Sequence, residues 1–230
     1  MRLKLILLIV AVLAATAQAQ EPWPQERPDE REQSVVNEDG GRSFIIKPAT
    51  VQLHGIIKSD NPAEVADLEQ HSIFLGSGWA APALRAQEPQ LSSLLVNIRE
   101  HAQLDELTQS GIKNLFGPAT SQEKLDVASD RNISDLEIQS VLAGMLKEGS
   151  MPRPNAGTIY VVFLDPGLHS TLGSLVAGKH YIAYHGFLNT SGAKIHYTVV
   201  PFQSDAQNAY QIALRALVVA ALNPTASSTN

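Results

Sequence analysis

The stretch Thr158-Ile159-Tyr160-Val161-Val162-Phe163-Leu164 decides the fold that the sequence predicts. It is a continuous run of apolar and β-favouring residues, and the turn residues Asp165-Pro166-Gly167 follow it at once. A strand with one face in water alternates apolar and polar residues, whereas a strand covered on both faces is apolar throughout. The run therefore predicts a central strand with a layer of helices on each side.

Upstream of this strand, residues 134–148 predict a helix. Ser134 and Glu137 have the spacing of a capping box, in which each side chain bonds to a backbone amide of the first turn. Gly149 predicts the end of the helix. The apolar residues after the cap fall on one helical stripe: Ile138, Val141, Leu142, Met145 and Leu146.

Downstream, residues 181–184 and 194–200 predict two strands, which a short Asn-Thr-Ser-Gly segment joins as an antiparallel hairpin. Residues 205–222 predict a last helix that Ser204 or Asp205 caps. This helix is apolar nearly all round, which is typical of a helix buried on several sides.

The N-terminal half predicts further strands at 50–57 and 71–75, and a helix from Pro89 to about Ile98. Strands interleaved with helices, together with one antiparallel hairpin, predict the fold class: an α/β single domain with a mixed β-sheet flanked by helices and a largely buried C-terminal helix.

The first residues, 1–19, have the character of a secretory signal peptide. Arg2 and Lys4 precede the apolar run Leu5–Ala15, and Ala17-Gln18-Ala19 has the small-x-small pattern of a cleavage site. A retained membrane anchor is the alternative, but the run is shorter than the roughly 20 residues that span a bilayer. We expect a secreted or periplasmic protein with no further transmembrane segment.

Composition divides the remaining chain. Residues 20–43 are rich in Glu, Pro, Gln and Arg, and this predicts a disordered linker because too little apolar surface is present to offset the ordering entropy. Residues 44–224 make up the predicted domain, and 225–230 a flexible tail.

The whole chain has 230 residues, a formal net charge of −6 and no cysteine. The acidic balance disfavours a nucleic-acid partner, which requires a basic face. The absence of cysteine excludes disulfides, thiolate metal sites and thiol nucleophiles. An exported protein without disulfides suits a bacterial periplasm or exterior better than a small secreted eukaryotic domain.

Common catalytic motifs are absent from the sequence. The run Gly173–Lys179 matches the start of a phosphate-binding P-loop, but His180 stands where that motif needs Ser or Thr, and a strand follows instead of a helix. Ser77 does not lie in a G-x-S-x-G elbow, and no H-E-x-x-H occurs. We assign no catalytic residue and no cofactor.

Histidines and one tryptophan are the candidates for ligand contacts. Four of the seven histidines lie between His169 and His196. His185 and His196 flank the predicted hairpin and are candidate ligand-binding residues. His180, His185 and His196 together are weak metal candidates, since the usual metal spacings are missing. The simpler interpretation is that these histidines bond to backbone or water.

Trp79 stands in a Gly-Ser-Gly-Trp loop and could stack on a sugar or a peptide. The alternative is that it is a core residue. It completes the predicted ligand-binding set of His185, Trp79 and His196.

Several segments, in order and character, resemble the EXORDIUM or phosphate-induced protein 1 family. They are Ile73–Trp79, Gly149–Pro154, Thr158–Gly167, Tyr184-His185-Gly186, Ile195–Pro201 and the helix ending Ala221-Leu222-Asn223-Pro224. The resemblance covers roughly Val51 to Pro224. It implies an exported protein, associated in plants with the cell wall, whose family has no settled biochemical activity.

Some relatives in that family carry a His-Glu pair on the last helix, which suggests a metal-dependent hydrolase. Here the corresponding positions are Arg215, Ala216 and Val219, which cannot act as metal ligand or general base. The family's cysteines are also missing.

The sequence leaves three hypotheses for function. The preferred one is an exported, non-catalytic protein that binds an envelope or extracellular glycan or peptide. The alternative is a metal-assisted hydrolase with a site rebuilt from His180, His185 and His196. A third is an inert domain held in the envelope by its acidic tail. The sequence does not fix an oligomeric state.

Overall fold

The computed structural model describes residues 33–36, 42–47, 67–94, 108, 112, 114–116, 121–190 and 193–222. The described strands form one sheet of eight strands and a second sheet of three. The strands are β1 (Gln33–Val36), β2 (Arg42–Ile46), β3 (Asp67–Leu75), β4 (Asn114–Phe116), β5 (Ser121–Lys124), β6 (Arg131–Ser134), β7 (Thr158–Leu164), β8 (Leu168–Leu172), β9 (Leu175–Val176), β10 (Ala183–Thr190) and β11 (Ala193–Val200). The helices are the 3-10 helix η3 (Ser77–Ala80) and the α-helices α1 (Pro82–Arg85), α2 (Glu88–Ser92), α5 (Asp135–Glu148) and α6 (Ala206–Leu222).

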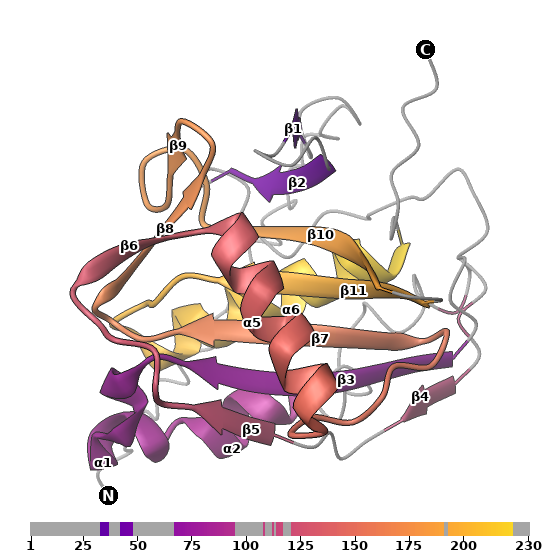
Figure 1. Cartoon of the computed structure of the whole chain (residues 1–230), viewed down its shortest axis with the longest axis horizontal. Coiled ribbons are helices and arrows are strands. Elements are labelled where there is room, and N and C mark those ends of the chain that lie inside the picture. Colours follow the sequence, from indigo (N-terminus) through magenta and orange to yellow (C-terminus); the bar gives the residue numbers. More distant parts are fainter. Residues whose placement is uncertain are drawn as a thin grey trace, which may run out of the picture.

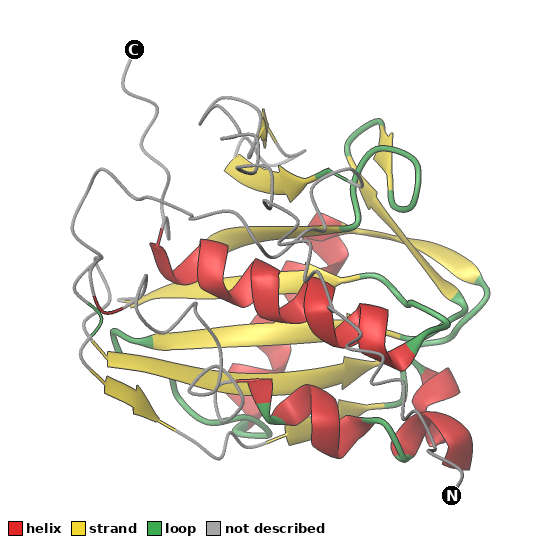
Figure 2. Cartoon of the chain, turned by 180° about the vertical axis from the view of Figure 1, so that it is seen from behind, coloured by secondary structure: helices red, strands yellow, loops and turns green. Residues whose placement is uncertain are grey.

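The large sheet is mixed, which confirms the predicted fold class. Its order is β1-β2-β10-β11-β7-β3-β4, and β5 also pairs with β3. The strands β11, β7, β3, β4 and β5 run parallel, whereas β10 is antiparallel to β11 and to β2. Figure 1 looks onto the face that α5 covers, and the reverse view in Figure 2 shows α6 and the short helices across the other face.

Strand β7 lies inside the sheet, and every one of its residues is buried. Ile159, Val161 and Phe163 belong to the core cluster on the α6 side. Tyr160, Val162 and Leu164 belong to the cluster on the α5 side. The continuous apolar run is thus explained by helices on both faces of the sheet.

The predicted capping box of α5 is present. Ser134 Oγ accepts from Glu137 N at 3.3 Å, and Ser134 N donates to Glu137 Oε2 at 2.9 Å. That backbone bond, with help from Arg131, lowers the pKa of Glu137. Gly149 ends the helix with a φ of +70°, a conformation that glycine adopts without strain.

Helix α6 begins after Asp205, whose carboxylate accepts from the amides of Gln207 and Asn208 at 3.2 Å. Asp205, and not Ser204, therefore caps it. Nearly all of the helix is buried, as predicted. Even so, within the described part of the chain no helix has the length and apolar character to cross a membrane.

Two boundaries differ from the sequence predictions. Strand β1 and the start of β2 fall within residues 20–43, so the predicted linker is wrong there, because β2 extends the sheet by pairing with β10. The strand predicted at 181–184 begins instead at Ala183 and runs to Thr190. The signal peptide, the strand at 50–57, the end of the helix at Pro89–Ile98 and the tail at 225–230 lie outside the described residues.

A buried polar cluster attaches α5 to the sheet. Tyr197 on β11 donates to the Asp135 carboxylate at 2.8 Å, and Gln139 Nε2 donates to the same carboxylate at 2.8 Å. Burial, and then the charge of Asp135, raise the pKa of Tyr197 well above its ordinary value. Gly186 makes room for this cluster, since a Cβ there would stand 3.0 Å from both Ser43 Oγ and Tyr197 Oη.

We expect Tyr197→Phe to lower the free energy of unfolding by about 1–3 kcal/mol, because a buried carboxylate loses a donor. Tyr160→Phe is the matched control, since its hydroxyl donates to a neutral carbonyl, that of Pro152, at 2.6 Å. It should cost about 0.5–1.5 kcal/mol. Urea denaturation measures both, and equal losses would contradict a special role for the Asp135 contact.

Candidate functional site

The parallel strands β3 and β7 end side by side, so the segments that follow them meet at one edge of the sheet. Gly76 N, after β3, donates to Lys124 O at the end of β5. Ser77 N donates to Val127 O, which lies beyond β5. In open α/β sheets, ligands bind outside the carboxyl ends of the strands. This edge, with the segments 76–79, 124–129 and 165–167, is the candidate site.

Asp165 is the centre of the candidate site. It follows β7 and is fully buried. Its Oδ2 accepts from Gly78 N at 2.6 Å and from the Ser129 hydroxyl, and its Oδ1 accepts from Gly167 N at 2.9 Å. A buried carboxylate needs such donors, because desolvation would otherwise cost several kcal/mol. The carboxylate therefore fastens three loops to one another.

The two serines form a directed relay. Ser129 donates its hydroxyl proton to Asp165, and its oxygen lies 2.8 Å from Ser77 Oγ. Because a hydroxyl has one proton to donate, Ser77 must be the donor in the bond between the two serines. Ser77 is exposed, and because its own proton is donated to Ser129, its oxygen keeps lone pairs that can accept a hydrogen bond. It presents an acceptor for an N–H or O–H of a ligand.

Glycine is required at two places in this loop. Gly76 has a φ of +116°, and a Cβ there would stand 2.4 Å from Asp165 Oδ2. A Cβ at Gly78 would stand 2.8 Å from the same oxygen. Both positions thus let the backbone approach the carboxylate closely.

The arrangement is suited to recognition more than to proton transfer. A general base must have a free lone pair within reach of the proton that it removes. The Asp165 carboxylate already accepts three hydrogen bonds, and a serine stands between it and Ser77. The relay polarises and orients the Ser77 hydroxyl, which favours hydrogen bonding to a polar ligand.

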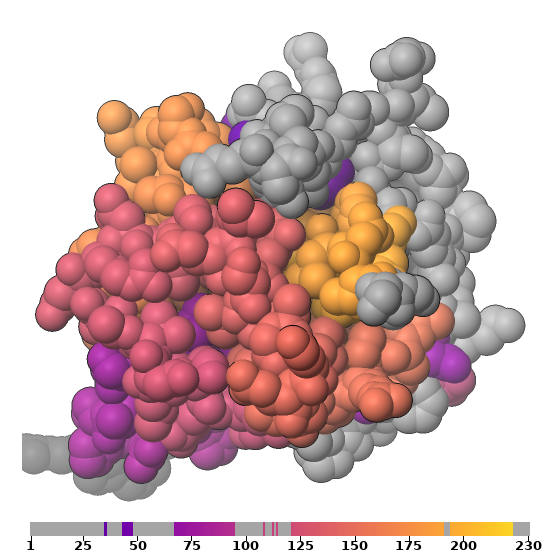
Figure 3. All heavy atoms as spheres, viewed as in Figure 1, coloured from indigo at the N-terminus to yellow at the C-terminus, as the bar shows by residue number. Residues whose placement is uncertain are grey.

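A groove of about 400 Å³ lies on the α5 side of the same 124–129 segment. Lys124 Nζ is 3.1 Å from Asp126 Oδ2 and 4.0 Å from Glu148 Oε2, and Met145 forms part of the floor. The groove is on the face that residues 121–150 largely make up in Figure 3. Lys124 is thus within ion-pair distance of both carboxylates, and the fourth charged side chain of the groove, Glu123, pairs with Arg85 outside the groove.

The structure places His185 in the core. It is 1% exposed, and its ring stacks on Phe44 with the centroids 5.0 Å apart. This placement leaves a ligand no access to the ring in this conformation. It favours the simpler interpretation of His185.

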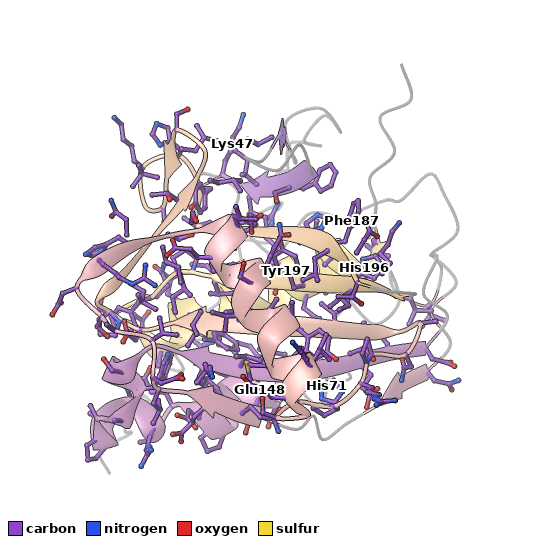
Figure 4. The ribbon with its side chains drawn as sticks, viewed as in Figure 1. Lys47, His71, Glu148, Phe187, His196 and Tyr197 are labelled. Atoms are coloured by element: carbon purple, nitrogen blue, oxygen red, sulfur yellow. The ribbon has the colours of Figure 1, made fainter. Side chains whose placement is uncertain are left out.

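His196 is half-buried on β11 and lies beside Phe187 of β10, with ring centroids 6.4 Å apart (Figure 4). His180 lies beyond β9, where its Nδ1 accepts from Val176 N at 3.0 Å. With His185 stacked on Phe44, the three histidines have separate partners. Among the described residues, no group of three His, Asp or Glu side chains could hold a metal ion.

Trp79 is also a core residue, 2% exposed. Its Nε1 donates to Phe163 O at 3.1 Å, and its ring packs edge-on against Phe74. The indole therefore anchors the loop that carries Ser77, and this supports its interpretation as a core residue.

The structure also shows where the P-loop-like run and the three positions singled out on the last helix lie. The P-loop-like run Gly173–Lys179 forms the turn of the β8–β9 hairpin and the bend after it, and no helix follows. Arg215, Ala216 and Val219 are buried in α6.

No sequence pattern indicates Ser129, and Ser77 and Asp165 are predicted only as residues of the segments that follow two strands. A signal was present: Gly-Ser-Gly follows one strand and Asp-Pro-Gly follows another. These two strands are parallel neighbours in the sheet, and the turns that follow them therefore lie at the same edge of it.

Comparison of the chain with known proteins identified no relative. No family model matches the chain, and neither a curated protein nor a solved structure matches it.

We expect Asp165→Asn to lower the free energy of unfolding by about 1–3 kcal/mol. The side-chain NH2 group of the asparagine cannot accept a hydrogen bond, so the buried Gly78 N–H would lose its acceptor. Asp126→Asn is the control, as Asp126 is exposed and should change the value by less than about 0.5 kcal/mol. Chemical denaturation compares the two variants. An Asp165→Asn protein as stable as the wild type would show that the carboxylate does not hold the loops.

His71, which the sequence did not single out, is a histidine whose pKa is lowered in the folded protein. It is buried on β3, stacks on Tyr160 and has its Nε2 3.4 Å from Glu69 Oε1. Burial lowers the pKa of His71, and the charge of Glu69 opposes part of this change.

The stability of the protein should therefore depend on His71 in mild acid. The native state binds the proton less readily than the unfolded chain, whose histidine has a pKa of 6.5. The free energy of unfolding should fall as the pH drops below about 6.5, and the fall should end below the lowered native pKa. Urea denaturation at several pH values should show a shallower fall for His71→Gln. Parallel profiles would contradict this expectation.

Proposed function

We propose that the chain is an exported, non-catalytic protein, EXORDIUM-like in type, that binds a glycan or peptide of the cell envelope or extracellular space. The observation that carries the proposal is the oriented hydroxyl of Ser77 at the carboxyl edge of β3. Sugar hydroxyls and peptide amides are the neutral donors that such an acceptor recognises.

Export is supported by the signal-like residues 1–19. Binding without catalysis is supported by the three hydrogen bonds that the Asp165 carboxylate already accepts and by Ser129, which stands between it and Ser77. The loops are held on the ends of buried strands, so the acceptor is presented by a rigid element, which lowers the entropy cost of binding.

The test is sedimentation of the purified chain with two insoluble materials. Peptidoglycan carries both glycan strands and peptides, whereas microcrystalline cellulose carries glycan alone. We expect retention on at least one of them. Retention on peptidoglycan alone would assign the ligand to its peptide or its amino sugars.

Ser77→Ala should weaken retention by roughly three- to tenfold, since one net hydrogen bond is lost. Ser140→Ala is the matched control, because Ser140 is exposed on α5 and donates to Leu136 O. It should bind as the wild type does. Equal binding by Ser77→Ala, retention on neither material, or release of soluble fragments by the protein would each refute the proposal.

A further inference from the structure

A second feature of the carboxyl edge is the segment Ala81–Glu88, which we call the strap. It contains α1 and the first residue of α2, and most of its side chains are exposed. The residues that anchor it on either side, Trp79 and Leu91, are each 2% exposed. A segment with few buried contacts between two buried anchors is able to open locally at low cost.

The strap lies beside an apolar crevice. A cavity of about 10 Å³ lies where β7 and β11 end, and its walls include Trp79, Phe163, Phe202, Leu91 and Ala209. That volume holds about one water molecule. Gln87 of the strap is part of the same wall. Helices α1 and α2 lie on the same face of the sheet as α6 (Figure 2).

The strap is attached to β5 by charge. Arg85 Nη2 lies 2.7 Å from Glu123 Oε2. Glu88, at the other end of the strap, interacts with both of these side chains. Its Oε1 is buried and has no hydrogen-bond partner in the described part of the chain. The Arg85 guanidinium therefore forms an ion pair with Glu123 and also interacts electrostatically with Glu88, whose Oε1 is removed from solvent.

Such an arrangement favours a proton on Glu88. Burial, and then the charge of Glu123, raise the pKa of Glu88 to about 7, although Arg85 opposes part of this rise. Because the native pKa exceeds the ordinary value of 4.5, a protonated Glu88 stabilises the observed position of the strap, and this contribution is lost as the pH rises from about 4.5 to about 7. An ionised Glu88 places a charge in a partly buried position and beside the charge of Glu123, and Arg85 opposes only part of this cost.

We propose that the strap is a lid over the apolar crevice, closed while Glu88 is protonated and loosened when Glu88 ionises, so that the crevice then admits an aromatic or other apolar ligand. Arg85 on α1 and Glu123 on β5 are the charged groups that the described residues place against Glu88. The lid does not include Ser77, and it goes beyond the glycan or peptide binding proposed above.

Tryptophan fluorescence tests the lid without any ligand. The chain has two tryptophans, so Trp23→Phe in the full-length protein leaves Trp79 as the reporter. We expect quenching of Trp79 by acrylamide to rise roughly threefold between about pH 5.5 and about pH 8.5, as the lid exposes the indole. In the same background, Glu88→Gln should remain weakly quenched at both pH values, whereas Glu148→Gln on α5 should keep the response.

Two further measurements keep the proposal falsifiable if Glu88→Gln folds poorly. Arg85→Ala should raise quenching already at about pH 5.5, because the strap then loses its ion pair with Glu123. Anilinonaphthalene sulfonate should bind the wild type more strongly at about pH 8.5 than at about pH 5.5. A quenching constant independent of pH, or a pH response unchanged in Glu88→Gln, would overturn the lid. Neither readout depends on Ser77 or on retention by peptidoglycan or cellulose, so the two proposals fail separately.

Discussion

Burial of β7 on both faces is the constraint on which the rest of the structure depends. A strand with no polar face is stable only between two apolar layers, and α5 and α6 provide them. Helix α6 packs against β10, β11 and β7 and also contacts α2, and it is apolar nearly all round. The α5 side instead contains a polar cluster, in which Asp135 and Tyr197 attach the helix to β11. Both helices thus cover a face of the sheet, α6 by apolar contacts and α5 by apolar contacts together with buried hydrogen bonds.

The same parallel arrangement creates the candidate site. Where β3 and β7 end together, Asp165 accepts from the backbone amides of Gly78 and Gly167. Satisfying this buried carboxylate fixes the position of Ser129 and, through it, the direction of the Ser77 hydroxyl. The core and the candidate binding edge therefore share one cause, which is the pairing of β3 with β7. The strap begins just beyond. It is held by the Arg85–Glu123 ion pair and by Leu84, which is only partly buried against the core, whereas Trp79 is buried.

The fold was more predictable than the site. The capping box of Ser134 and Glu137 and the run Thr158–Leu164 are local signals, and the structure confirms both. The candidate site depends on residues far apart in sequence, such as Ser77, Ser129 and Asp165, and no local pattern indicates which strands are neighbours. The histidines, by contrast, lie close together in sequence and have separate partners in space. His185 and His196 share one face of the β10–β11 pair at diagonal positions, and each lies beside its own aromatic ring, whereas a turn holds His180 elsewhere.

By itself, the sequence determined the class of the domain, the central strand, the capped helix and the buried last helix, because periodicity and caps are short-range properties. Tertiary structure alone decided that β2 joins the sheet beyond β10, that Trp79 and His185 belong to the core, and that Asp165 holds two serines in a relay. These outcomes depend on strand order and register. Both are set by the packing of the whole chain and not by any one segment.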